Sequence, residues 1–219
     1  MKNKRNVTEF VLTGLTQNPK MEKVMFPVFL VLYMITLSGN LLIVVTITTS
    51  QALSSPMYFF LSMLASSKTV YTLFIIPQML SSFVTQTQPI SLAGCTTQTF
   101  FFVTLAINNC FLLTVMGYDH YMAICNPLRY RVITSKKVCV QLVCGAFSIG
   151  LAMAAVQVTS IFTLPFCHTV VGHFFCDILP VMKLSCINTT INEIINFVVR
   201  LFVILVPMGP VSYTHLTLP

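Results

Sequence analysis

Charged side chains are scarce in this sequence: they make up 8% of its 219 residues, and only five residues are Asp or Glu. A soluble domain usually carries about 25% charged residues, because its surface must face water. Here hydrophobic residues make up 56% of the chain, and the mean hydropathy is +0.86. A larger core cannot hide this excess, since surface falls only slowly with size. The composition therefore excludes most soluble proteins and indicates an apolar surface covered by a bilayer.

The motifs of enzymes and nucleic-acid-binding proteins are also missing. The sequence has no Gly-rich phosphate loop, no His-Glu-x-x-His, no nucleophile elbow and no carboxylate pair suited to acid–base catalysis. We therefore expect no enzymatic activity and no cofactor. The net charge of +7 does not form one basic patch, because Lys and Arg gather mainly in the first 23 residues and between Arg129 and Lys137. Basic residues so placed predict the lipid bilayer, and no nucleic acid, as the partner.

Long apolar runs separated by short polar breaks are the main pattern that is present. About 20 apolar residues in a helix span the roughly 30 Å hydrocarbon core of a bilayer. The sequence therefore predicts an all-α membrane protein with a single bundle over residues 24–211. Its helices are expected at about 24–47, 57–83, 95–124, 138–164 and 193–211. Residues 1–23 form a polar segment ahead of the first helix. Because the first apolar run begins only after this segment, it does not resemble a cleaved signal peptide.

The glycosylation sequons indicate that the N-terminus is extracellular. Those at Asn6 and Asn188 lie on the same side of the membrane if four helices separate them, and glycosylation would place that side outside the cell. Basic residues between 129 and 137 suit a cytoplasmic loop. Those in the N-terminal segment oppose this orientation, so the basic count alone is nearly balanced. We give the sequons and cysteines more weight and predict a multi-pass protein of the plasma membrane.

The eight cysteines fall into two groups of four. One group lies within or at the edges of the apolar runs, where a thiol acts as a small apolar side chain: Cys110, Cys125, Cys139 and Cys144. The other group maps to the outer, oxidising side, where disulfides are plausible: Cys95, Cys167, Cys176 and Cys186. Four cysteines allow three pairings, and spacing alone does not choose between them. Zinc is the competing interpretation, because His168 and His173 lie nearby. The spacing matches no regular zinc module, so we expect no metal site.

Several short motifs occur in order along the chain. They are GN at 39–40, PMYFFL at 56–61, MGYDHYMAICNPLRY at 116–130, LPFC at 164–167, HFFCD at 173–177 and KLSC at 183–186. Together they resemble the odorant (olfactory) receptor family of rhodopsin-like G-protein-coupled receptors, from about residue 8 to 209. Any one of them alone would be weak evidence.

The resemblance implies a rhodopsin-like helical bundle, of which about five of seven transmembrane helices are present. It implies olfactory chemosensation, in which a small volatile odorant binds and a heterotrimeric G protein raises cAMP. It also implies the disulfides Cys95–Cys176 and Cys167–Cys186.

The G-protein-coupling region implied by the resemblance is Asp119, His120 and Tyr121. Two residues depart from the family pattern. The family has Arg where this chain has His120, and histidine lacks the five-donor fork of a guanidinium group. Lys68 lies where relatives carry an acid, and a charge at mid-membrane is costly unless it is paired or functional. Both departures predict weakened signalling.

One helical stripe is the candidate odorant site. Its residues follow the i, i+1, i+4, i+5, i+8 spacing of one helix face: Phe102, Val103, Ala106, Ile107 and Cys110. Such a stripe more often packs against another helix, and only the resemblance favours a pocket. An apolar lining would suit small, mostly uncharged molecules.

The end of the chain and two intramembrane charges leave alternatives open. Residues 212–219 are polar, so we predict a non-homologous tail. We also predict a truncated, non-signalling copy, because without helices six and seven a ligand would have no two-state element to bias. A transporter or channel fragment is the alternative function, with Lys68 and Arg200 as pathway charges, although no repeat supports it. Arg200 could also extend toward the outer interface.

Overall fold

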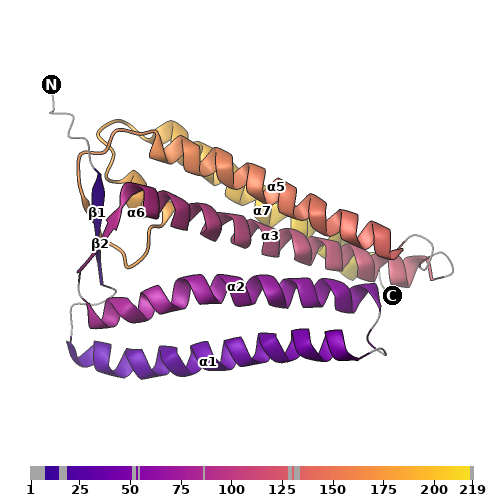
Figure 1. The fold of residues 1–219 in the computed structure, drawn as a ribbon. Helices are drawn as coiled ribbons and strands as arrows, with labels where there is room; N and C mark the ends of the chain where they lie inside the picture. The colour runs from indigo at the N-terminus through magenta and orange to yellow at the C-terminus, as the bar shows by residue number, and fades with distance from the viewer. Residues whose placement is uncertain are drawn as a thin grey trace.

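Five long helices dominate the computed structural model, which describes residues 8–14, 19–50, 53, 55–85, 87–127, 130 and 134–217. The helices are α1 (Pro19–Thr49), α2 (Pro56–Val84), α3 (Leu92–Cys125), α5 (Lys136–Phe162) and α7 (Thr190–Thr217). A short helix, α6 (Ile178–Met182), lies between α5 and α7. Figure 1 shows the long helices running roughly alongside one another, with strand β1 (Glu9–Thr13) and the end of α7 at opposite ends of the bundle.

The helical membrane fold predicted from composition is confirmed. Four of the helices are long and apolar enough to cross a bilayer: α1 from Lys20, α2, α3 and α5. The fifth predicted helix is present as α7, but among the described residues it does not join these four. In the best window of α1 none of the residues is buried, so its apolar side chains need lipid or further protein to cover them.

The last helix does not end where the sequence predicted. We expected it to stop at Val211, near Pro207, Gly209 and Pro210, but the backbone of α7 stays helical to Thr217. That prediction is wrong, because it gave proline too much weight as a helix breaker. Pro27 inside α1 and Pro77 inside α2 are likewise accommodated. Membrane helices tolerate proline when neighbouring groups satisfy the freed backbone carbonyls.

A small sheet closes one end of the bundle (Figure 1). Strand β1 (Glu9–Thr13) lies between β2 (Thr87–Ser91) and β3 (Val170–Val171), antiparallel to the first and parallel to the second. Burial alternates along β1 as in a half-buried strand. Its inward residues Phe10 and Leu12 are 0% and 2% exposed. The N-terminal segment and two interhelical connections therefore lie together at one end.

Two buried apolar clusters hold the bundle together. The larger one lies beside the sheet and joins β1, α3, α5, α6 and the connection before α6; it includes Phe10, Ile107, Ile161 and Val181. The smaller one lies between α2, α3 and α5 and is formed by Phe60, Leu112, Cys139 and Val143. Helix α3 contributes to both clusters and is the central element of the fold.

A glycine lets α3 and α5 approach closely. A Cβ atom built on Gly150 of α5 would lie 2.1 Å from Asn108 Oδ1 and 3.4 Å from the backbone oxygen of Thr104, both on α3. Asn108 is 0% exposed, so its side chain has little room to retreat. Small residues at such crossings allow membrane helices to pack through direct van der Waals contact.

Replacing this glycine tests the crossing. We expect Gly150→Ala to lower the free energy of unfolding by about 1–3 kcal/mol, the usual effect of overpacking, measured as thermal unfolding in detergent micelles. Gly145→Ala is the matched control on the same helix, where an added Cβ meets nothing within 4 Å. It should be neutral or slightly stabilising, because Ala favours a helix more than Gly does. Equal effects of the two changes would contradict the packing described.

Candidate ligand-binding site

A cavity of about 360 Å³ lies between α3, α5, α6 and α7. Its α3 wall consists of Phe102, Val103, Ala106, Ile107 and Cys110, the five residues of the predicted stripe. The structure therefore places the whole stripe on one cavity. That these residues bind an odorant stays a prediction. The volume lies at the lower end of the roughly 300–1,000 Å³ usual for ligand pockets.

Helix α7 supplies the opposite wall through a stripe that was not predicted from the sequence. Its members are Val199, Arg200, Val203 and Ile204. They repeat the i, i+1, i+4, i+5 spacing seen on α3, so the same periodicity could have identified them. Gln157, Asp177 and Ile178 complete the lining. No local pattern indicated these three, because α5 and the segment before α6 reach the cavity only through the tertiary fold.

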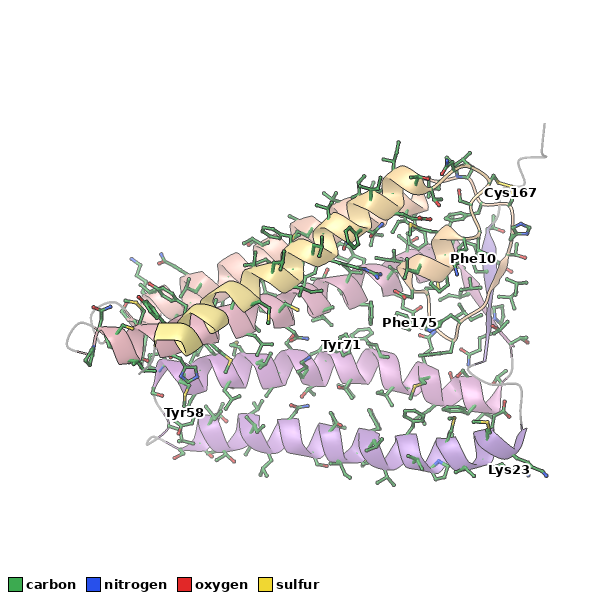
Figure 2. The ribbon with its side chains drawn as sticks, turned by 180° about the vertical axis from the view of Figure 1, so that it is seen from behind. Phe10, Lys23, Tyr58, Tyr71, Cys167 and Phe175 are labelled. Carbon is green, nitrogen blue, oxygen red and sulfur yellow. A yellow bond between two sulfur atoms is a disulfide. The ribbon has the colours of Figure 1, made fainter. Side chains whose placement is uncertain are left out.

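Contacts between aromatic rings connect the cavity to α2. The ring of Phe102 lies 5.0 Å from that of Phe175 and 5.5 Å from that of Tyr71, measured between centroids. Figure 2 shows Tyr71 extending from α2 toward α3, and Phe175 in the segment near α6. The Lys68 Nζ atom lies 5.8 Å from the centroid of Tyr71, within the range of a cation–π contact. The exposed Lys68 therefore lies near the cavity wall without lining it.

Two of the three polar side chains that line the cavity form hydrogen bonds within the described part of the protein, and the third does not. Gln157 Nε2 donates to Asn196 Oδ1 at 3.2 Å. Asp177 Oδ1 accepts from the backbone N–H of Ile178 at 2.8 Å and so caps α6. No hydrogen bond or ion pair joins Arg200 to any of the described residues. The lining thus carries two engaged polar side chains and one guanidinium group with its donors free.

Two disulfides position the segment that covers the cavity. Cys95 at the start of α3 is bonded to Cys176, with Cα atoms 5.5 Å apart, and Cys167 is bonded to Cys186, with Cα atoms 5.2 Å apart. These are the pairings that the resemblance implied. Thr99 Oγ1 also donates to the backbone oxygen of Cys176 at 2.7 Å. Asp177 and Ile178 directly follow this anchored cysteine, and the disulfide therefore brings them to the cavity.

The remaining predicted sites lie apart from the cavity. Asn188 is exposed and its Oδ1 accepts from the hydroxyl of Thr190 at 2.5 Å, whereas Asn6 falls outside the described residues. The thiols of Cys110, Cys125, Cys139 and Cys144 are free. Within the described ranges no group of three His, Cys, Asp or Glu side chains could hold a metal ion.

Asp119 lies at the end of α3 far from the sheet, and its partner is a tyrosine. Asp119 as a whole is 3% exposed, and its Oδ1 atom accepts a hydrogen bond from Tyr130 Oη at 2.9 Å. His120 is exposed, while Tyr121 is half-buried. Burial and the hydrogen bond to Asp119 raise the pKa of Tyr130 to about 12. Tyr130 belongs to the motif at 116–130, but nothing in that motif indicated that it is the partner of Asp119.

This pairing predicts a stability change at high pH. An unfolded tyrosine loses its proton near pH 10, whereas folded Tyr130 keeps its proton until about pH 12. The folded chain binds more protons between these values, so the stability contribution is complete below pH 10 and is lost toward pH 12. Unfolding midpoints measured across this window should fall in the wild-type chain and fall less in Tyr130→Phe. Tyr33→Phe on α1 is the control and should behave like wild type; equal slopes in all three chains would refute the pairing.

Fold and site together define a multi-pass helical membrane protein with a small apolar cavity near its sheet-covered end. The sequence model of the olfactory receptor family matches residues 29–216. The chain is 82% identical over 214 residues to "Putative olfactory receptor 10J6" of Homo sapiens, covering 98% of this chain and 78% of the relative. It is 61% identical to "Olfactory receptor 10J5" of Homo sapiens, covering 98% and 69%, and 60% identical to that of Mus musculus, covering 95% and 68%.

The chain belongs to the olfactory receptor family and is an odorant-receptor-like G-protein-coupled receptor. The alternative of a transporter or channel fragment finds no support among these relatives. The family match reaches residue 216, so it overlaps the segment 212–219 for which a non-homologous tail was predicted. The origin of that segment stays a prediction.

Proposed function

We propose that the chain binds small, largely apolar odorants in the cavity between α3, α5, α6 and α7. The observation that carries this proposal is the convergence of two apolar stripes, one on α3 and one on α7, on a single cavity of about 360 Å³. An apolar cavity with a few convergent polar groups is the usual form of a small-molecule site. The disulfide between Cys95 and Cys176 supports it by holding the covering segment in place.

Filling the cavity tests odorant binding. Ala106 lies on its α3 wall, and Ala106→Phe should abolish or strongly weaken binding, because the larger ring occupies the ligand's space. Binding to the chain in lipid nanodiscs can be measured by saturation-transfer NMR with a panel of small odorants. Ala155→Phe is the matched control, since Ala155 is exposed on α5, and it should bind as wild type does. Equal binding by both variants would place the site elsewhere, and no binding by the wild-type chain would overturn the proposal.

We further propose that the sheet-covered end faces the cell exterior and the Asp119 end faces the cytoplasm of a cell whose plasma membrane holds the chain. The sheet gathers β1, β2 and β3 at one end, together with both disulfides, which form in oxidising compartments. Exposed Asn188 belongs to the same end of the molecule. Glycosylation of Asn188 would report this orientation.

The cytoplasmic end is proposed to meet a heterotrimeric G protein only weakly. His120 is exposed beside the buried Asp119, at the position where the family carries Arg. An imidazole offers fewer donors than a guanidinium group and no bidentate fork. Lys68 places a second unusual charge within the membrane. We therefore propose a chain that binds its ligand but signals little.

Restoring the arginine tests this account of coupling. His120→Arg should raise odorant-driven cAMP above that of the parent chain when both are expressed at equal surface levels. His168→Arg, at an exposed position of the outer segment, is the control for added charge and should leave cAMP unchanged. A strong cAMP response in the parent chain would contradict the proposal that His120 limits coupling, as would no gain in the His120 variant.

A further inference from the structure

Arg200 is the unusual member of the cavity lining. It follows the first residue of α7, Thr190, by ten positions, which places its backbone about 15 Å along the helix at 1.5 Å per residue. Its side chain is exposed, and an unpaired charge on an apolar helix of a membrane bundle is costly. Yet no described residue forms a hydrogen bond or ion pair with it. Its five N–H donors are therefore available to a ligand.

The acid on the same cavity does not neutralise this guanidinium group. Asp177 lines the cavity with Arg200, but the two side chains form no ion pair within the described structure. The Oδ1 atom of Asp177 already accepts the backbone N–H of Ile178. The cavity thus offers free donors and an acceptor that is partly engaged. A complementary ligand must bring acceptor oxygens.

The other residues that line the cavity determine the chemistry of the rest of the ligand. Apart from Gln157, Asp177 and Arg200, the cavity is bounded by apolar side chains and one thiol. Gln157 is engaged with Asn196, so Arg200 is the one lining residue with a charged, unsatisfied donor. An amphiphilic molecule with an apolar tail and a polar head fits this division. A carboxylate is the best head group, because it matches the planar guanidinium fork with two parallel hydrogen bonds and cancels its charge.

We propose that the cavity takes small carboxylic acids with a short apolar tail, and that Arg200 binds their carboxylate. This inference rests on the proposed function and deepens it by assigning a carboxylate head group to the largely apolar ligand, whereas the sequence predicted mostly uncharged ligands. The tail lies between the stripes of α3 and α7. Asp177 opposes the bound carboxylate by like-charge repulsion and limits the affinity.

A matched pair of ligands tests the head group. Octanoate and methyl octanoate share a tail and differ in charge, and their binding to the full chain in phosphatidylcholine nanodiscs can be compared by saturation-transfer NMR. Octanoate should bind more tightly than its ester. Arg200→Gln should weaken octanoate binding by roughly tenfold or more, a difference of about 1.4 kcal/mol, and leave the ester nearly unchanged. Arg200→Lys should retain part of the octanoate affinity, because it keeps the charge but loses the fork.

Two further variants separate this role from general charge and folding effects. Lys183→Gln removes an exposed cation that does not line the cavity, and it should leave octanoate binding unchanged. Asp177→Asn should strengthen octanoate binding, since an amide oxygen can still cap α6 but no longer repels the ligand. Opposite effects at two positions of one cavity cannot come from misfolding.

A lipid phosphate is the other source of anionic oxygens for Arg200. Repeating the measurement in maltoside micelles, which contain no phosphate, distinguishes it. The proposal expects similar octanoate affinity in both environments. Arg200-dependent binding that occurs only in the micelles would show that a lipid headgroup occupies the guanidinium in membranes, and would overturn the proposal.

The remaining outcomes distinguish the inference from the proposed function. Ester binding that Ala106→Phe abolishes, with no preference for octanoate and no effect of Arg200→Gln, would overturn the inference and leave odorant binding intact. If neither octanoate nor any member of the odorant panel binds the wild-type chain, the proposed function fails and the inference fails with it.

Discussion

The disulfide between Cys95 and Cys176 is the interaction on which the site depends most. It joins the start of α3 to a segment 81 residues later in the chain, and Thr99 adds a hydrogen bond to the same backbone. A crosslink that closes so long a loop removes much of the freedom of the unfolded chain. Its local effect is more specific. It sets Phe175 against Phe102 and brings Asp177 to the cavity wall, so the connection between α5 and α6 becomes part of the cavity lining.

Local sequence patterns predicted which helix face lines this site, but they did not predict which helices and strands pack together to form it. The α3 stripe could be predicted because a 3.6-residue period places Phe102, Ala106 and Cys110 on one face whatever surrounds the helix. The pairing of β1 with β3 could not, because register between residues 11–12 and 170–171 depends on tertiary contacts. The same holds for Gln157 and Asp177, which reach the cavity only after α5 and the segment before α6 pack beside α3. Periodicity shows which face of a helix is apolar, but it does not show which element packs against that face.

Two buried asparagines of α3 lack the hydrogen-bond partners that a buried amide group usually has. Asn108 and Asn109 are 0% and 4% exposed, and their amide groups find no hydrogen-bond partner within the described part of the chain. Leaving such a group unsatisfied costs about 1–3 kcal/mol. Gly150 partly explains why Asn108 is accommodated, since any larger residue there would collide with it. The α3–α5 contact is therefore held by close packing more than by hydrogen bonds, in keeping with other membrane helices.

Helix α3 carries both the cavity and the Asp119 end, which bears on how ligand and G protein could communicate. Cys110 and Asp119 are nine residues apart on one continuous helix, about 14 Å at 1.5 Å per residue. A rigid helix transmits a shift only if its two positions differ in energy with and without ligand. At the far end the hydrogen bond from Tyr130 to Asp119 is a contact that could be made or broken in such a shift. Because the acid is held by a tyrosine while His120 stays exposed, the far end can respond to a movement of α3, yet it presents no guanidinium group to a partner. The residues that shape the cavity are thus distinct from His120, so the proposed ligand binding and the proposed weak coupling can be altered separately.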